Sequence, residues 1–278
     1  MDATHERGGK CVENVLLAFG LTALAGLSTG IGSALALLTK KTNTKFLSVS
    51  LGFSAGVMIY VSMVEIFFKA RTTLAAELGE RLGSWVTVGA FFAGILLIAV
   101  IDNVLPNTEN PHEIHRVEEM DENKGARESK LLRTGVFTAL AIAVHNFPEG
   151  IATFVSALQE PSIAIPIVVA IAIHNIPEGI GVAVPVYYAT GSRKKAFLYS
   201  FLSGLAEPVG ALIGYLILMP IMSDTVFGVI FAAIAGIMVF ISLDELLPAA
   251  REYGEHHLSI YGLIAGMAIM AVSLLLFL

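Results

Sequence analysis

The sequence predicts an all-α membrane protein, and three observations lead to this fold class. Hydrophobic residues make up 55% of the 278 residues and charged residues only 14%, whereas soluble domains run nearer about 45–50% and about 25%. Apolar runs recur along the chain, each long enough to cross about 30 Å of hydrocarbon as a helix. Segments of the sequence are also repeated in helices that are expected to run in opposite directions, which is typical of membrane transporters.

Eight apolar runs divide the chain into its predicted elements. The polar opening MDATHERGGK is followed by no small-residue cleavage site, and the next run is too long for a signal peptide, so we expect a short tail before the first helix. Residues 103–131 are acidic and poor in apolar residues, which predicts a mobile cytoplasmic loop. We predict one transmembrane domain over residues 1–278, with helices at about 12–38, 46–68, 84–102, 132–157, 162–188, 196–219, 225–247 and 258–278.

The positions of lysine and arginine predict how these helices are oriented. When the eight runs alternate across the bilayer, twelve of the 17 Lys and Arg residues fall on one side and five on the other. Cytoplasmic loops carry the excess of positive charge. The side with twelve is therefore expected to face the cytoplasm, and both termini are expected to lie outside.

Two pairs of segments show internal repetition. Residues 142–152 and 171–181 share eight of eleven identities, and residues 55–71 and 235–251 share seven of seventeen. The members of each pair fall on helices of opposite direction. We therefore predict that the first three helices and the last three form an inverted repeat around the fourth and fifth. Inverted repeats favour a secondary transporter whose site lies near the bilayer midplane, at the interface of the repeats.

The first repeated pair carries the motif His-Asn-x-Pro-Glu-Gly twice. His145 and Glu149 are four residues apart, as are His174 and Glu178, so each pair lies on one face of its helix. Where the two faces meet, two imidazoles and two carboxylates form a cluster of four metal ligands. Neutral amide oxygens to supplement this cluster are expected from the next position round each helix, Asn146 and Asn175.

Prolines in the same motifs are expected to kink both helices. Pro148 and Pro177 lack an N–H group and displace the carbonyl four residues earlier, which exposes a backbone oxygen beside the cluster. A third buried acid, Glu207, is followed by Pro208 in the run at 196–219. We therefore expect the sixth helix to contribute a carboxylate to the same region.

The energy of burying charge decides between a metal site and simple hydrogen bonding between helices. A carboxylate at the centre of a bilayer costs at least about 2.5–3.5 kcal/mol. Divalent cations or protons offset this cost, and imidazole with carboxylate suits zinc, iron and manganese. The alternative is that each histidine and glutamate only hydrogen-bonds between helices. Two copies of the motif and a third acid favour metal binding.

Other classes of function are less consistent with this sequence. The single Cys11 excludes a disulfide framework and a multi-cysteine metal site. No His-Glu-x-x-His motif is present, so the best-known membrane metalloprotease chemistry is not expected, and the chain is predicted not to be an enzyme. An intramembrane metalloenzyme and a selective divalent cation channel remain the alternatives to a transporter. No nucleic-acid partner is expected.

Four motifs give the sequence a family resemblance. They are HNFPEG, HNIPEG, GLAEPVG and SLDELLP, at residues 145–150, 174–179, 204–210 and 242–248. With the eight-helix plan, they resemble the ZIP (Zrt-, Irt-like) family of divalent-metal transporters, in particular its bacterial ZupT type, over nearly the whole chain. The resemblance implies uptake of zinc, with iron, manganese and cadmium as further substrates, through a two-metal site in a bacterial inner membrane. It implies no cofactor, and it leaves a homodimer open.

The resemblance also implies particular metal ligands. Met58 falls where some bacterial members use a methionine on the first metal, although packing in the core or against lipid is the alternative for this residue. Many eukaryotic members have a serine where this chain has Asn146, which leaves a broader choice of metal open. The complete set of ligands carried over by position is His145, Asn146, Glu149, His174, Asn175, Glu178, Glu207 and Met58.

Overall fold

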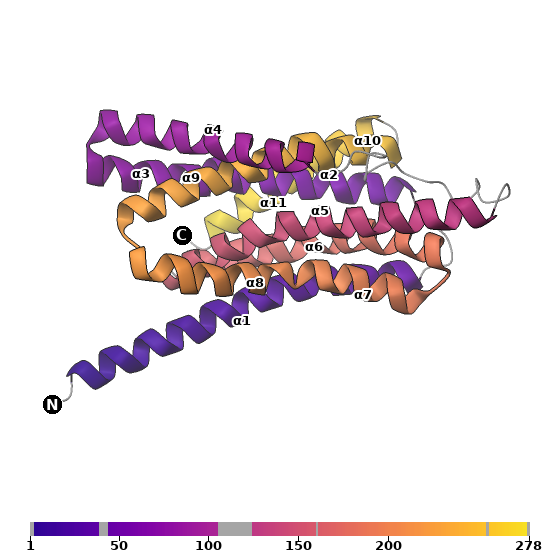
Figure 1. Ribbon diagram of the computed structural model, residues 1–278. Helices are drawn as coiled ribbons and strands as arrows, with labels where there is room; N and C mark the ends of the chain where they lie inside the picture. Colours follow the sequence, from indigo (N-terminus) through magenta and orange to yellow (C-terminus); the bar gives the residue numbers. More distant parts are fainter. Residues whose placement is uncertain (1–2, 39–43, 105–123, 160, 254–255, 277–278) are drawn as a thin grey trace.

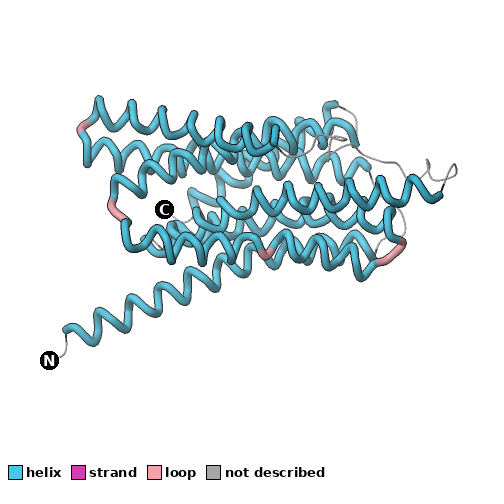
Figure 2. The backbone as a smooth tube through the Cα atoms, in the orientation of Figure 1, coloured by secondary structure: helices cyan, strands magenta, loops and turns pink. Residues whose placement is uncertain are grey.

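The computed structural model is helical throughout the residues that it describes, which are 3–38, 44–104, 124–159, 161–253 and 256–276. Figures 1 and 2 show long helices joined by short turns, and no strand occurs in these ranges. The predicted all-α class is therefore confirmed for this part of the chain. The elements are α1 Ala3–Leu38, α2 Thr44–Tyr60, η1 Val61–Ile66, α3 Phe67–Leu78, α4 Glu80–Val104, α5 Lys124–Gln159, α6 Pro161–Thr190, α7 Arg193–Gly204, α8 Ala206–Ile213, η3 Gly214–Leu218, η4 Met219–Ile221, α9 Asp224–Ile241, η5 Ser242–Leu246, α10 Leu247–Tyr253 and α11 His256–Leu276.

Six helical segments of the described part are long and apolar enough to cross a membrane. They are Asn14–Leu38, Ser48–Leu78, Glu80–Asp102, Arg193–Ile217, Asp224–Arg251 and His257–Leu276. The chain is therefore a multi-pass membrane protein. The predicted fourth and fifth spans correspond to α5 and α6. Both helices contain positions whose side chains lie outside the described part of the chain. The count of six therefore refers to the other helices.

Two helices extend further than their apolar runs predict. The helix α5 begins at Lys124 rather than near residue 132, and α1 begins at Ala3 rather than near residue 12. Hydropathy marks only the part of a helix that suits hydrocarbon, whereas the segment KGARESK at 124–130 is polar but rich in helix-forming residues. Of the predicted loop at 103–131, residues 105–123 lie outside the described residues.

Two of the predicted spans contain a π-helical turn at matching places in the repeated segments. The turn η1 interrupts the predicted span 46–68, and η5 interrupts the span 225–247. In both, a serine hydroxyl near the start of the turn donates to a methionine carbonyl four residues earlier, Ser62 to Met58 at 2.6 Å and Ser242 to Met238 at 2.7 Å. A π turn inserts one residue into a helix and rotates the residues after it. Apolar periodicity alone does not reveal such a turn.

The predicted span 196–219 is also interrupted. The helix α7 ends at Gly204, Leu205 forms a turn, and α8 begins at Ala206. Pro208 explains this break because it has no N–H to donate to the carbonyl of Gly204. The break places Glu207 in the first turn of a new short helix, buried inside the protein.

The helices pack as two groups, which Figure 1 shows as an upper and a lower layer. The first, here called the α2 group, contains α2, α3, α4, α9, α10 and α11; the second, the α6 group, contains α1, α5, α6, α7 and α8. Contacts within each group are extensive. Contacts between the groups are made mainly by α2 with α6 and by α5 with α9.

Glycines bring helix backbones into direct contact, and among the described glycines they do so only inside each group. A Cβ at Gly150 would collide with the carbonyl of Glu207, and one at Gly210 would collide with the carbonyl of Phe147, so α5 and α8 touch reciprocally. Small residues allow this close approach in membranes. The equivalent reciprocal pairs are Gly52 and Gly262 for α2 with α11, Gly56 and Gly266 for the same helices, Gly94 and Gly236 for α4 with α9, Gly32 and Gly179 for α1 with α6, and Gly26 and Gly204 for α1 with α7.

Candidate metal centre

The two repeated motifs face each other across α5 and α6. These helices follow each other with a single residue between them and pack side by side. Nε2 of His174 on α6 lies 3.3 Å from Oε2 of Glu149 on α5, and both side chains are buried. The same imidazole nitrogen lies 4.0 Å from Oε1 of Glu178, one turn further along α6. Two carboxylates from different helices therefore converge on one imidazole.

Met58 lies in the buried core of the α2 group, on the side of α2 that faces α6. Its neighbour one turn earlier, Ser54, donates to the backbone carbonyl of His174 at 3.4 Å. Residues four apart share a helix face, so Met58 lies one turn further along the same face of α2 as Ser54. The structure thus places Met58 among buried hydrophobic residues at the boundary between the two groups.

Asn175 connects α6 with α1 and α8. Its amide nitrogen donates to the backbone carbonyl of Ala25 at 3.0 Å and to Oε1 of Glu207. Both polar side chains are buried. The break in the helix before Glu207 and the motif on α6 therefore meet through this amide, which brings the third acid to the edge of the α5–α6 cluster.

Asn146 is arranged in the same manner on α5. Its amide nitrogen donates to the backbone carbonyl of Ser203 on α7 at 3.3 Å. In both asparagines the NH₂ group is used by a backbone carbonyl, and the amide oxygen has no hydrogen-bond partner in the described part of the chain. One carboxylate oxygen of Glu149 and one of Glu207 also have no hydrogen-bond partner in the described part. Four buried acceptor oxygens of the predicted residues are therefore available to a cation.

One predicted ligand is placed by its backbone alone. His145 lies on α5, and its side chain is outside the part of the structure that is described. Among the side chains that are described, no three His, Cys, Asp or Glu residues are already arranged as a metal-ion group. The structure thus brings together His174, Glu149 and Glu178 in one cluster and Asn175 with Glu207 in an adjoining one, while Asn146 contacts α7.

Several hydroxyl groups around this region were not predicted from the sequence. Thr29 of α1 and Thr153 of α5 are buried, and their hydroxyl oxygens have no hydrogen-bond partner among the described residues. Ser33 and Ser200 bond to each other at 2.9 Å, and Ser200 also donates to the carbonyl of Gly179 in the second motif. The signal available in the sequence was spacing, because Thr153 follows Glu149 by four residues.

The electrostatics of the region favour a positive ligand. Glu149, Glu178 and Glu207 are all buried, and no lysine or arginine is found among the buried residues of the described part. An ionised carboxylate in low dielectric needs a partner of opposite charge or a proton. The donor set here is carboxylate, imidazole and amide oxygen, which binds divalent metals of the zinc, iron and manganese type.

Comparison with known proteins decides the family. A family model described as ZIP Zinc transporter matches residues 102–274. A protein of Streptococcus mutans named Zinc transporter ZupT is 68% identical over 265 residues, which cover 95% of this chain and 99% of the relative. The chain belongs to the ZIP family.

Further relatives that are also named Zinc transporter ZupT support membership of the ZIP family. The protein of Clostridium perfringens is 63% identical over 283 residues, covering 98% of this chain and 99% of the relative. The protein of Nitratidesulfovibrio vulgaris is 62% identical over 272 residues, covering 95% and 98%. The predicted resemblance to the ZupT type is confirmed. A ZIP protein is a divalent-metal transporter, so the enzyme alternative is excluded.

Proposed function

We propose that this ZIP protein carries divalent metal ions, with zinc preferred, into the cytoplasm through a binuclear site between α5 and α6. The observation that carries the proposal is the convergence of Glu149 and Glu178 on His174 within a buried region that contains no buried lysine or arginine in its described part. The names of the relatives, Zinc transporter ZupT, support zinc as the substrate. Iron, manganese and cadmium are the further substrates.

Two metal positions are proposed, and they share Glu149 and Glu178. The first uses the imidazole–carboxylate cluster, with Met58 approaching from α2 across the boundary of the groups. The second uses amide oxygens and the acid after the helix break, because Asn175 already contacts Glu207. The proposed ligands are His145, Glu149, His174, Glu178 and Met58 at the first position and Asn146, Glu149, Asn175, Glu178 and Glu207 at the second.

The transport step that we propose is a movement of one helix group against the other. Glycine-mediated backbone contacts hold helices together inside each group and do not cross between groups among the described residues. The proposed ligands lie in the α6 group, except for Met58. A shift of this group past the α2 group would carry the ion from one side of the membrane to the other, and Met58 would be left behind.

The proposed topology is eight crossings in a bacterial inner membrane, formed by one transmembrane domain over residues 1–278. The first three and last three spans form the predicted inverted repeat around α5 and α6. Support for the repeat comes from the matching π turns η1 and η5 in its second and seventh spans. Both termini lie outside, and the excess of positive charge faces the cytoplasm.

A selective channel remains the rival mechanism, and the helix grouping favours a carrier. Uptake that saturates at micromolar metal and is slow per molecule supports the carrier. A flux that rises linearly with metal concentration and follows the membrane potential supports a channel.

The experiment is zinc uptake into metal-free liposomes containing the purified chain. Glu178→Ala and His145→Ala are expected to lower uptake by about 10- to 100-fold or more, because removal of even a supporting group near a metal costs that much affinity. The matched control is Glu77→Ala, which removes an exposed carboxylate on α3. Unchanged uptake in both site variants would refute the site.

A further inference from the structure

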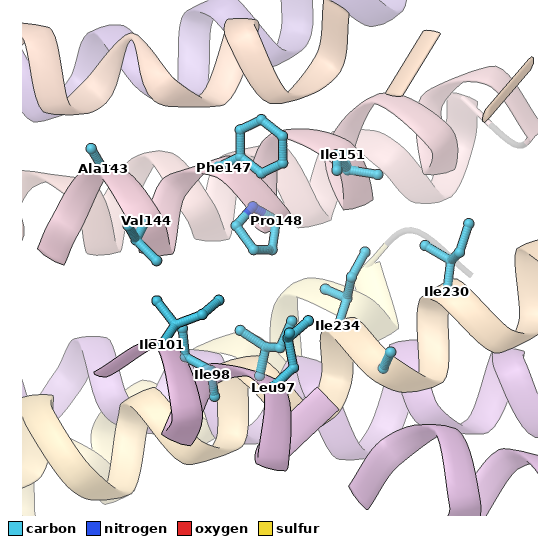
Figure 3. Close-up of a pocket in the computed structure, with 12 residues that line it drawn as sticks. Leu97, Ile98, Ile101, Ala143, Val144, Phe147, Pro148, Ile151, Ile230 and Ile234 are labelled. Carbon is cyan, nitrogen blue, oxygen red and sulfur yellow. The ribbon is translucent and has the colours of Figure 1, made fainter. Parts of the chain in front are cut away.

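A recess of about 480 Å³ lies between α4, α5 and α9, where the two helix groups meet. Figure 3 shows its walls: Leu97 and Ile98 of α4 face Val144 and Pro148 of α5 across the opening, with Ile234 of α9 beside them. The volume is within the range of about 300–1,000 Å³ that is typical of small-molecule pockets. This recess is separate from the polar cluster around His174.

The chemistry of the walls restricts what can enter. Every residue that lines the recess is alanine, valine, leucine, isoleucine, phenylalanine or proline. A metal ion would find no ligand there, and a peptide strand would leave its backbone N–H and C=O groups without partners in hydrocarbon. A hydrocarbon chain has no polar group to satisfy. The walls therefore select an apolar, flexible occupant.

The recess is continuous with the surface of the protein that faces lipid. Leu97 is 54% exposed at its rim, whereas Ile98 and Ile234 are each only 4% exposed in its walls. On the same helix, Leu96 and Val100 next to the rim are 65% and 60% exposed. These residues belong to the candidate membrane span Glu80–Asp102, so this apolar face of α4 contacts acyl chains of the bilayer. The occupant available at the entrance is therefore a lipid tail.

The depth of the recess also suits the end of a lipid tail. Pro148 lines it and is the residue next to Glu149, so the recess lies at the level of the polar cluster, on another face of α5. Along α5, Val144 lies twenty residues after the first residue of the helix, Lys124, about 30 Å at the rise of an α-helix. The walls are thus deep inside the helical bundle and remote from the polar end of α5.

We propose that this recess binds the terminal part of an acyl chain from a phospholipid of the surrounding bilayer. The chain enters past Leu97 and lies between Pro148 of α5 and Ile234 of α9. It fills the space that separates the two helix groups at this point and contacts the same helix that carries Glu149. This proposal concerns lipid binding and does not depend on which metal is carried.

The experiment uses the purified full chain in vesicles of phosphatidylethanolamine and phosphatidylglycerol. A small fraction of the phospholipid carries a photoreactive diazirine, placed either at the end of one acyl chain or next to the headgroup. After illumination, labelled peptides are quantified by mass spectrometry. The end-labelled lipid is expected to modify the recess peptides several-fold more than the lipid-facing peptide of α11, and the headgroup-proximal probe is expected not to.

Two variants make this test specific. Ala233→Phe places a ring in the recess and is expected to lower the labelling of the recess several-fold. Ala268→Phe adds the same ring on the exposed face of α11 and is expected to leave the labelling of the recess unchanged. Equal labelling of the recess and of α11, or no effect of Ala233→Phe in a folded protein, would overturn the proposal. If Ala233→Phe does not fold, the comparison of the two probes in the unaltered protein decides.

Discussion

At the level of single residues, the polar groups of the centre are held by backbone carbonyls rather than by each other alone. Asn175 uses its NH₂ group on Ala25 and Glu207, and Asn146 uses its own on Ser203. These bonds orient the amide oxygens, link α6 with α1 and α8, and link α5 with α7. The two asparagines of the repeated motif therefore serve as structural links and as proposed metal ligands at the same time.

Asn175→Ala is expected to lower the free energy of unfolding by about 1 kcal/mol, because it leaves a buried carboxylate oxygen of Glu207 without its amide donor. The measurement is thermal unfolding of the purified chain in detergent without metal. Asn14→Ala is the matched control, since Asn14 lies exposed on α1. An identical melting temperature for Asn175→Ala and the unaltered chain would contradict the linking role.

At the level of helices, close backbone contacts position the third acid. A Cβ at Gly150 has no room because the carbonyl of Glu207 occupies its place, and Gly210 is packed against Phe147 in the same way. The pair α5–α8 is therefore held at the distance that lets Glu207 reach Asn175. Gly150 directly follows Glu149, so the residue that sets the helix spacing and a proposed ligand are adjacent.

Gly150→Ala is expected to destabilise the chain by about 1–3 kcal/mol through overpacking and to lower zinc uptake, because α8 must move away from α5. Gly181→Ala is the contrasting change on α6, where a Cβ meets nothing within 4 Å. That change is expected to stabilise the helix by about 0.5–1 kcal/mol. Thermal unfolding and liposome uptake measure both. A neutral Gly150→Ala would show that α5 and α8 are not held by this contact.

At the level of the whole molecule, metal binding and folding are expected to be coupled. The buried carboxylates disfavour the folded state until a cation or a proton joins them. A ligand that binds only the folded chain stabilises it by an amount that grows with concentration. The proposed cargo should therefore stabilise the protein as well as pass through it.

Zinc at about one hundred times its dissociation constant is expected to raise the stability by about 2.7 kcal/mol. The measurement is a melting curve in increasing zinc, and magnesium serves as the control ion because it prefers oxygen ligands in octahedral geometry. Glu149→Gln is expected to reduce the zinc effect and leave the response to magnesium unchanged. A melting temperature that does not depend on zinc would contradict the proposed site.

The proposed topology gives a further prediction for the whole molecule. Cys11 is the single cysteine of the chain and precedes the first membrane span. A thiol reagent that does not cross membranes is therefore expected to modify Cys11 in intact spheroplasts. With Cys11→Ser and Glu118→Cys combined, modification is expected only after the membrane is opened, since residue 118 belongs to the predicted cytoplasmic loop. The reverse pattern would invert the proposed orientation.

By itself, the sequence determined the helical membrane class, the family and the residues of the two motifs. Hydropathy is a local property, and the spacing of His174 and Glu178 by four residues follows from the helix repeat. Only the tertiary structure decided which helices form each group and that Asn175 reaches Glu207. It also decided that a break at Leu205 and the three π turns η1, η3 and η5 interrupt the apolar spans. These features depend on contacts between segments far apart in the chain, where glycines and prolines at particular depths set how closely backbones pack and where their hydrogen bonds end.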